Sequence, residues 1–313
     1  MIMVIGSINL DFSSVVMRLP KWGETVQARG SHISPGGKGA NQALAARLAG
    51  ARVEMAGAVG DDHLAGQALE NLRAADVDLS GIDRVQDQTG TAQIITEVGG
   101  TNLIVVSPGA NAKLTPDKAA AAVARLSPRD TLMLQLEIPL EAVEAALAQA
   151  RKQGVRTILN AAPFVDDVIH ITPLADTTIV NEIEFGSLTG ADDLEGSASY
   201  LAAARDYALA RRCNLIVTLG SNGAAACING GVFTVPAPKI DPLDTVAAGD
   251  TFCGYYAAGL DLGGSARESV RQAVDAGALA CLRTGAQVSI PSRLNLEAWL
   301  RREGGVSSGR PSR

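Results

Sequence analysis

An aspartate just inside a predicted helix is the residue of this sequence best suited to chemistry. Asp250 follows the string DTVAAG at 244–249, and an apolar run with helical spacing continues over 252–260. The small residues before it are Ala247, Ala248 and Gly249. They leave backbone N–H groups accessible at a helix start, where those donors and the helix dipole attract phosphate. Asp250 could then take a proton from a hydroxyl beside that phosphate. The plainer alternative is an acid that only stabilises the helix start.

A second candidate segment is rich in glycine. Residues 36–42 have the sequence GGKGANQ, and the helical pattern 40–48 follows. Glycines let a backbone approach a ligand closely, and the side chain of Asn41 can both donate and accept hydrogen bonds. The segment is neither a Walker loop nor a dinucleotide G-x-G-x-x-G fingerprint. By itself it is equally consistent with an ordinary glycine turn that caps a helix.

Polar residues also follow two predicted strands. Asn9 and Asp11 close the predicted strand 2–8, and Glu137 follows the predicted strand 131–136. Ligands of open parallel sheets bind beyond the carboxyl ends of the strands, and a carboxylate that accepts two hydroxyl protons suits a polyhydroxy ligand. An Asx turn at Asn9 and a solvated acid at Glu137 remain the alternatives.

Alternating strand and helix patterns must position these residues. The remaining predicted strands are 53–59, 155–159, 177–180 and 215–219, and the remaining predicted helices are 63–75 and 197–211. This alternation predicts an α/β fold with a mostly parallel central sheet and helices on both faces. Two β-rich stretches break the rhythm, one over 12–33 and one over 91–106 with a turn at Gly99-Gly100. We expect them to form antiparallel strands of a small second sheet, such as a lid.

Composition excludes several classes of protein. The chain has 313 residues, of which 47% are hydrophobic, so a disordered protein is excluded. The 33 acidic and 27 basic residues give a net charge of −6, which argues against nucleic-acid binding but not against a nucleotide as a small ligand. The four cysteines are widely spaced, which favours reduced thiols over a zinc cluster or disulfides. Without a signal-peptide pattern or a membrane-spanning apolar run, the sequence predicts a cytoplasmic protein that binds no membrane.

From about Met3 to Arg302 the chain resembles the ribokinase-like (PfkB-type) sugar kinase family. The resemblance rests on GGKGANQA at 36–43 with Gly50 and Gly60 downstream, on 244–252, and on shorter strings at 6–11, 20–25, 160–163, 218–220 and 285–287. It implies one kinase domain over 1–303, with lid strands inserted at about 12–34 and 91–106. The Gly- and Ser-rich tail 304–313 is expected to be disordered.

The resemblance also implies an activity. GGKGANQ and the paired alanines before Gly249 favour members that phosphorylate ribose over those that act on fructose or adenosine. The expected reaction is ATP-dependent phosphorylation of the primary hydroxyl of D-ribose, giving ribose 5-phosphate. A kinase for another pentose or a nucleoside, such as deoxyribose or pseudouridine, is the first alternative. A catalytically silent sugar-binding regulator is the second.

Site roles carry over from the family position by position. Asp250 matches the catalytic base, with Ala247, Ala248 and Gly249 as the anion hole. The sugar site matches Asn9, Asp11, Gly37, Lys38, Asn41 and Glu137, with Ala92 and Ile94 on the lid. Asn181 and Glu184 match a motif near phosphate and hydrated Mg²⁺, and Thr218, Gly220, Gly223 and Gly249 match the ATP site. Asp244, Val246, Ala280, Arg283, Gly285 and Ser289 match an activating K⁺ site, to which Arg283 would contribute only its carbonyl. The alternative for Asp244 is a turn cap.

Two positions depart from the family pattern, and one partner is implied. Val274-Asp275 stands where Asn or His is common beside adenine, and Gln93 stands in a lid strand where an apolar residue is usual. Exposed lid strands have unpaired edges. The resemblance therefore implies a homodimer that pairs through the lid.

Overall fold

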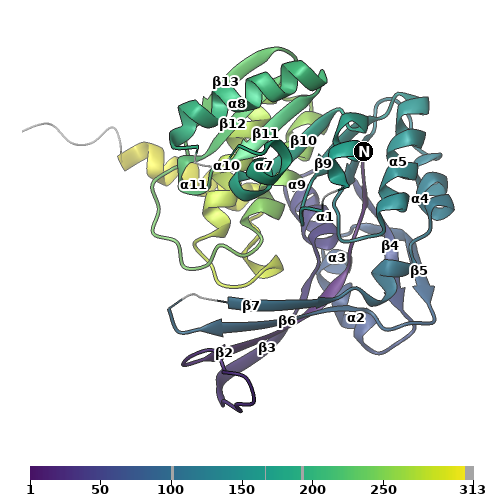
Figure 1. Ribbon diagram of the computed structural model, residues 1–313, viewed down its shortest axis with the longest axis vertical. Helices are drawn as coiled ribbons and strands as arrows, with labels where there is room; N and C mark the ends of the chain where they lie inside the picture. The colour runs from purple at the N-terminus through teal and green to yellow at the C-terminus, as the bar shows by residue number, and fades with distance from the viewer. Residues whose placement is uncertain (100–101, 166, 192–193, 307–313) are drawn as a thin grey trace, which may run out of the picture.

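The computed structural model describes residues 1–99, 102–165, 167–191 and 194–306. In this part of the chain the strands form a large and a small sheet (Figure 1). The large sheet has the order β13-β12-β11-β10-β9-β8-β1-β4-β5. Its strands are β1 (Ile2–Ile5), β4 (Val53–Gly60), β5 (Asp78–Val85), β8 (Thr131–Leu134), β9 (Arg156–Asn160), β10 (Thr177–Asn181), β11 (Asn214–Thr218), β12 (Ala224–Ile228) and β13 (Gly231–Val235). Only the β11-β12 and β12-β13 pairs of this sheet are antiparallel, so the predicted mostly parallel sheet is confirmed.

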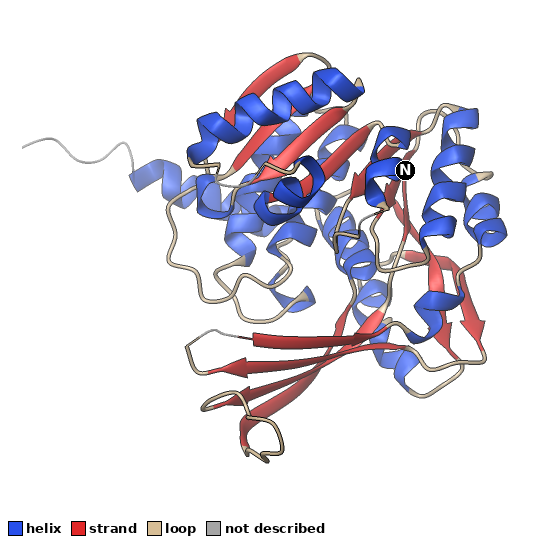
Figure 2. Cartoon of the chain, viewed as in Figure 1, coloured by secondary structure: helices blue, strands red, loops and turns tan. Residues whose placement is uncertain are grey.

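Helices cover both faces of the large sheet (Figure 2). They are α1 (Lys38–Leu48), α2 (Leu64–Ala68), α3 (Glu70–Ala74), α4 (Pro116–Val123), α5 (Leu140–Gln153), α6 (Val168–Ile171), α7 (Glu182–Thr189), α8 (Gly196–Arg211), α9 (Ala248–Asp261), α10 (Ala266–Ala280) and α11 (Arg293–Val306). Short 3₁₀ turns lie at η1 (Gly109–Lys113), η2 (Thr172–Leu174), η3 (Gly220–Asn222) and η4 (Gln287–Ser289).

The alternation of side chains along β1 divides the interior into two cores. Ile2 and Val4 pack in one core with residues of α1, α9 and α10. Met3 and Ile5 pack in the other with residues of α4, α5 and α8. Successive side chains of a strand point to opposite faces, so an uninterrupted apolar strand needs cover on both.

The small sheet projects from the body as a lid (Figure 1). Its order is β3-β2-β6-β7, with β2 (Asn9–Val16), β3 (Ala28–Gly36), β6 (Gly90–Glu97) and β7 (Asn102–Ser107). The prediction of antiparallel strands holds for β2-β3 and β6-β7, but β2 and β6 pair in parallel. The two hairpins come from distant parts of the chain, and both leave the body in the same direction, which makes their central pair parallel. Gly100 of the expected turn lies outside the described residues.

The first strand is shorter than the sequence predicted. β1 ends at Ile5, and Asn9 begins β2, so Asn9 and Asp11 belong to the lid sheet. The reason is that the start of α1 packs directly against the end of β1. A Cβ on Gly39 would lie 2.6 Å from the carbonyl carbon of Gly6. The start of α1 therefore blocks the extension of β1, and the chain turns aside into the lid.

Two further boundaries differ from the predictions. The helix predicted over 63–75 is two helices, α2 and α3, separated at the buried Leu69. Helix α11 continues to Val306, so 304–306 is helical rather than part of a tail; the rest of the predicted tail, 307–313, lies outside the described residues. None of the helices in the described ranges is long and apolar enough to cross a membrane.

Gly254 allows α1 and α9 to cross in close contact. A Cβ at this position would lie 2.5 Å from the Cβ of Ala45 and 2.6 Å from the carbonyl oxygen of Gln42. Asp250 precedes Gly254 by one helical turn, so the crossing brings it against the start of α1. The contact therefore fixes both a core and the position of the predicted base.

We expect Gly254→Ala to lower the free energy of unfolding by about 1–3 kcal/mol, because the added methyl must push the two helices apart. Chemical denaturation measures this. The matched control is Gly66→Ala in α2, where a Cβ meets open space and alanine favours the helix. Equal destabilisation of the two variants would contradict the packing argument.

Candidate active site

Asp250 lies in the first turn of α9, and its carboxylate is bound at both oxygens. Its residue is 8% exposed. Asn41 Nδ2 donates to Oδ2 at 2.9 Å, and Gln42 Nε2 donates to Oδ1 at 3.0 Å. Burial raises the pKa of Asp250, while the charge of Lys38 and these two hydrogen bonds oppose the rise. The arrangement holds an aspartate that can exchange a proton.

The backbone before Asp250 is shaped as the entrance to a helix. Ala247 precedes α9 in the left-handed region, with φ of 60°, a conformation that costs a side-chain-bearing residue energy. Of the predicted anion-hole residues, Ala248 donates its N–H to the carbonyl of Thr245 at 3.3 Å. The next two N–H groups, of Gly249 and Asp250, have no acceptor within the helix at its first turn. They are the donors best placed to bind an anion.

Three carboxyl groups act on the charge of one buried lysine, and a fourth lies close to two of them. Burial opposes the positive charge of Lys38, but Asp250, Glu137 and Glu184 outweigh it and raise the pKa of the lysine. Burial also raises the pKa of Glu184. Burial, then the charges of Glu137 and Asp250, raises the pKa of Asp11 to about 7. The structure therefore brings these predicted residues, from five segments of the chain, into one electrostatic cluster with an excess of negative charge.

Asp11 and Glu137 differ in how their oxygens are satisfied. Asp11 Oδ1 is buried and has no hydrogen-bond partner among the described residues. By contrast, Glu137 Oε2 accepts from Ser7 Oγ at 2.6 Å and from the N–H of Lys38 at 3.0 Å. An orphaned buried oxygen is costly unless a ligand satisfies it. Asp11 is thus free to receive a ligand donor, while Glu137 anchors the start of α1.

Asn111 is a residue of the site that the sequence analysis missed. It is 1% exposed, and its Nδ2 donates to Asn9 Oδ1 at 2.8 Å and to the carbonyl of Ile8 at 3.1 Å. Gly90 packs against this contact, because a Cβ there would lie 2.3 Å from both amide groups. The orientation of the Asn9 amide is therefore fixed by η1. No motif near Asn111 indicated this role.

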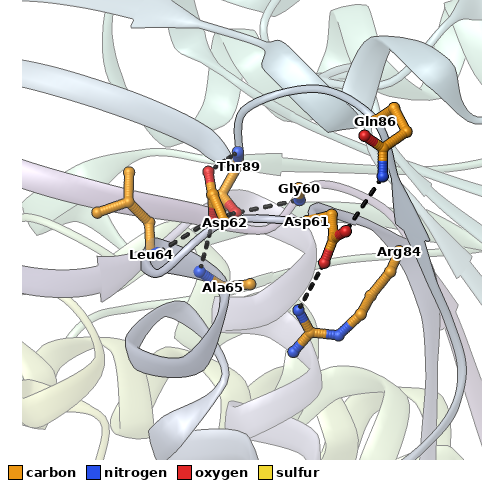
Figure 3. A network of polar contacts seen from close by, with 8 residues as sticks. All are labelled: Gly60, Asp61, Asp62, Leu64, Ala65, Arg84, Gln86 and Thr89. Carbon is orange, nitrogen blue, oxygen red and sulfur yellow. Dashed lines mark hydrogen bonds and ion pairs between the residues drawn. The ribbon is translucent and has the colours of Figure 1, made fainter.

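The root of the lid is fastened to the body by Asp62 (Figure 3). Thr89, the residue before β6, donates its N–H to Asp62 Oδ2 and its hydroxyl to Oδ1, each at 2.7 Å. The N–H groups of Leu64 and Ala65 donate to the same carboxylate at 3.1 Å. Burial acts to raise the pKa of Asp62, but these donors outweigh it and lower the pKa. One acid thus joins β6 to the start of α2.

A cavity of about 600 Å³ lies beside the start of α9. Four predicted nucleotide residues line it: Thr218, Gly220, Gly223 and Gly249. Gly223 has φ of +91°, and a Cβ there would lie 2.0 Å from the carbonyl oxygen of Val235, so only glycine fits. Apolar residues that the sequence analysis did not name complete the wall, among them Pro238, Ile240 and Phe252.

The two remaining predicted nucleotide-site residues do not line this cavity, and the two positions that depart from the family pattern differ from each other. Asn181 and Glu184 form the capping box of α7, each side chain bonded to the other's N–H at 2.8 Å. Val274 lines the cavity, whereas Asp275 pairs with Arg271 at 3.1 Å. The departure at 274–275 therefore leaves an aliphatic side chain, not a polar amide, facing the cavity.

A second cavity of about 410 Å³ lies between the lid and the body. Asp11 and Ile94 line it from the lid side, and 242–246 and 284–286 from the body. Ala92 is the register partner of Asp11 on the neighbouring strand. Pro242 and Thr245 line both cavities, so the two meet at the segment that leads into α9. Asp250 follows that segment.

The predicted K⁺ residues are only partly gathered. Asp244 Oδ1 accepts the N–H of Val246 at 3.0 Å, and Oδ2 accepts the N–H of Gly285 at 2.8 Å. The carbonyl of Ala280 accepts the N–H of Arg283, and Ser289 Oγ donates to the carbonyl of Ala286. The described residues contain no group of three His, Cys, Asp or Glu side chains that could hold a metal ion. A cation here would depend mainly on backbone carbonyls.

Comparison with known proteins now decides the family. The profile of the pfkB family carbohydrate kinases matches residues 1–293. The chain belongs to the pfkB family of carbohydrate kinases. As a member it is an ATP-dependent enzyme that transfers a phosphoryl group to a sugar hydroxyl.

Individual members of the pfkB family support this placement. A ribokinase of Schizosaccharomyces pombe is 36% identical over 308 residues, covering 95% of this chain and 96% of the relative. A deoxyribokinase of Salmonella typhi is 33% identical, covering 93% and 95%. The structure of Arabidopsis thaliana ribokinase complexed with ribose and ATP superposes with a TM-score of 0.83 at 29% identity, covering 96% of this chain and 98% of that one. The ribokinase-like fold with its separate small sheet is thereby confirmed.

The raised pKa of Asp11 predicts how stability depends on pH. Its pKa is about 7 in the folded protein and near 3.8 when unfolded. The folded state therefore binds more protons between these values, and stability falls as pH rises from about 4 to 7. Asp11→Asn, which cannot ionise, should flatten this part of the curve.

Thermal unfolding between pH 5 and pH 8 tests this expectation. The melting temperature of the wild type should fall more across that interval than that of Asp11→Asn. Asp206→Asn, at an exposed acid, is the control and should follow the wild type. Parallel curves for Asp11→Asn and the wild type would refute the assignment.

Proposed function

We propose that this pfkB kinase phosphorylates D-ribose at its primary hydroxyl to give ribose 5-phosphate, with Asp250 as the general base. One observation carries the proposal above the others. The carboxylate of Asp250 is buried in the first turn of α9, and the segment leading to it lines both the nucleotide cavity and the lid cavity. A base at that junction can serve an acceptor in one cavity and a phosphate donor in the other.

The reaction then needs one proton transfer and one displacement. The hydroxyl O–H bond breaks as its proton passes to Asp250, and the freed oxygen forms a bond to the γ-phosphorus. The bond between that phosphorus and the β-γ bridging oxygen breaks, and its electrons leave with ADP. Charge on the transferring group is stabilised by the N–H groups at the start of α9. These N–H groups lie at the N-terminus of the helix, which is the positive end of its dipole.

Sugar binding is assigned to Asp11 and Ile94, which line the lid cavity, and to further residues that do not line it. Asp11, whose Oδ1 has no partner among the described atoms, accepts hydrogen bonds from the sugar hydroxyls. Asn9, held by Asn111, offers its Nδ2. Gly37, Lys38, Asn41 and Glu137 complete the floor, and Ala92 and Ile94 cover the sugar from the lid. Closing the lid excludes water, which protects ATP from hydrolysis.

The nucleotide cavity is assigned to ATP, held at Thr218, Gly220, Gly223 and Gly249. Excess negative charge around Lys38 fits a divalent cation, since Mg²⁺ is commonly held through one or two carboxylates, water and substrate phosphates. Glu184, with Asn181, would hold Mg²⁺ through water. Bound there, Mg²⁺ would neutralise phosphate charge.

The activating K⁺ is assigned to the loop before α9. Asp244 joins this loop to the 284–286 turn through its bonds to Val246 and Gly285. The main-chain N–H groups of Leu243 and Asp244 both donate to the carbonyl of Cys281, so the two segments already lie together. Carbonyls of Val246, Ala280, Arg283, Gly285 and Ser289 would supply the remaining oxygens, and a hard monovalent cation suits such a set.

The protein is proposed to form a homodimer through the lid and to lie in the cytoplasm. Side chains 103–106 of β7 are about half exposed and apolar, and β3 and β7 are the edges of the lid sheet. Pairing lid to lid in a homodimer would cover this surface. The four cysteines are free, in keeping with the reducing cytoplasm.

The sugar itself is open to direct measurement, because one relative is a deoxyribokinase. ADP release should be measured with ribose, 2-deoxyribose, hexoses and nucleosides at matched concentrations. The proposal expects the highest kcat/KM for ribose. A higher value for another sugar would transfer the assignment to that sugar.

Asp250→Asn should lower kcat by roughly 100- to 10,000-fold, because the amide keeps the shape but cannot accept the proton. Sugar affinity, measured by calorimetry, should change little. Turnover near that of the wild type would remove Asp250 from the role of base.

Activity should rise several-fold when K⁺ replaces Na⁺ at constant ionic strength, and Asp244→Ala should lose this response. A smaller cation fits a ring of oxygens built for K⁺ poorly. If wild type and variant both give a flat monovalent-ion titration, Asp244 is only a turn cap.

A further inference from the structure

Gln42 links the predicted base to the central sheet. It is fully buried on α1 and lines neither cavity. Its Nε2 donates to Asp250 Oδ1 and to Asn160 Oδ1, both at 3.0 Å. Its Oε1 accepts from Gln135 Nε2 at 2.7 Å. Gln135 follows β8 and Asn160 ends β9, so one amide joins a helix and two strands to the base.

The orientation of the Gln42 amide is fixed by the hydrogen bonds of its partner Asn160. Asn160 Nδ2 donates to the main-chain carbonyl of Ile179 at 3.2 Å, which turns Asn160 Oδ1 toward Gln42. Gln42 must therefore present its NH₂ group to two oxygens. The reversed amide would place three oxygens together without a proton between them. A backbone carbonyl thus decides which end of Gln42 faces Asp250.

Among the described residues, Gln135 leaves one buried oxygen without a hydrogen bond in this arrangement, which lowers the stability of the fold. Its Oε1 is buried without a hydrogen-bond partner in the described part of the chain, and Gly6 makes room for it, since a Cβ there would lie 1.9 Å away. An unpaired buried carbonyl typically costs about 1–3 kcal/mol. Within the described ranges, Gln135 leaves its own acceptor oxygen unpaired but keeps its Nε2 directed at Gln42. This indicates that the hydrogen bond to Gln42 is needed.

The two oxygens of Asp250 consequently have different neighbours. Oδ1 is held by Gln42, whose side chain is fully buried. Oδ2 is held by Asn41, a residue assigned above to the sugar floor. An arriving hydroxyl can replace the Asn41 contact but not the Gln42 contact, because Gln42 is enclosed by the sheet.

We propose that Gln42 is a positioning residue: it anchors Asp250 Oδ1 to the sheet and leaves Oδ2 to accept the proton of the sugar hydroxyl. The proposal rests on the proposed function, since it needs Asp250 to be the base. Gln42 does not touch the reacting atoms. It acts by holding the carboxylate in place and by favouring its ionised form with an N–H donor.

Gln42→Met tests the proposal, because methionine has a similar length and no donor. The single-turnover rate of phosphoryl transfer at saturating substrates should fall roughly 10- to 100-fold. The KM for ribose should stay within about threefold, since Oδ2 and the sugar floor are untouched. The acidic midpoint of the rate against pH should move to higher pH, because a bond that favours ionised Asp250 is lost.

Gln42→Glu changes charge at nearly constant shape. Two carboxyl groups about 3 Å apart do not ionise together, so the acidic midpoint should rise by more than about one unit. This variant keeps the proposal testable if Gln42→Met does not fold, as judged by circular dichroism and melting temperature. The matched control is Gln67→Met, the same change at an exposed position of α2, which should leave rate and pH profile unchanged.

The outcomes separate the possibilities. A purely structural role for Gln42 predicts a lower melting temperature with an unmoved pH midpoint, and that result would overturn the proposal. A single-turnover rate equal to that of the wild type in folded Gln42→Met would also overturn the proposal. If Asp250→Asn is inactive while both Gln42 variants behave as wild type, only the role of Gln42 fails. If Asp250→Asn turns over normally, the proposed function fails with it.

Discussion

The close crossing of α1 and α9 is the contact on which the site depends. Gly254 has no side chain, and Ala45 and Ala46 on the facing helix are small and fully buried. The helices can therefore approach until Asp250 meets Asn41 and Gln42 one turn away. Larger residues at the crossing would separate the carboxylate from both amides. A packing constraint in the core thus sets the hydrogen-bond distances at Asp250.

The same crossing requires support from the sheet. Gly39 on α1 lies against Gly6, which ends the β1 ladder, and Gly6 in turn makes room for Gln135. The start of α1 therefore has a fixed position above β1 and β8, where Glu137 also binds its first N–H. Packing and hydrogen bonds therefore join α1, β1 and Asp250. The lid is joined to the body at its root, where Asp62 accepts both the N–H and the hydroxyl of Thr89 (Figure 3).

Burial of charge explains why this unit suits proton transfer. Asp11, Asp250 and Glu184 are all driven toward their neutral forms by burial, and one lysine offsets only part of the repulsion. In such a cluster the protonation of one group depends on its neighbours. Hydrogen bonds from Asn41 and Gln42 favour the ionised form of Asp250 and so distinguish it from Asp11, which has an oxygen without a partner in the described chain.

The sequence by itself determined the fold class, the lid insertions and the family, because strand and helix patterns and the strings 36–43 and 244–252 are local. It placed Asp250 at a helix start for the same reason. It could not determine that β1 ends at Ile5 or that β2 and β6 pair in parallel, since both depend on how distant segments pack. Nor could it show that Gln42, Gln135, Asn160 and Asn111 orient the polar groups of the site. A buried amide finds its partner only when the tertiary structure brings together residues that lie 93 to 208 positions apart, and no local pattern records that pairing.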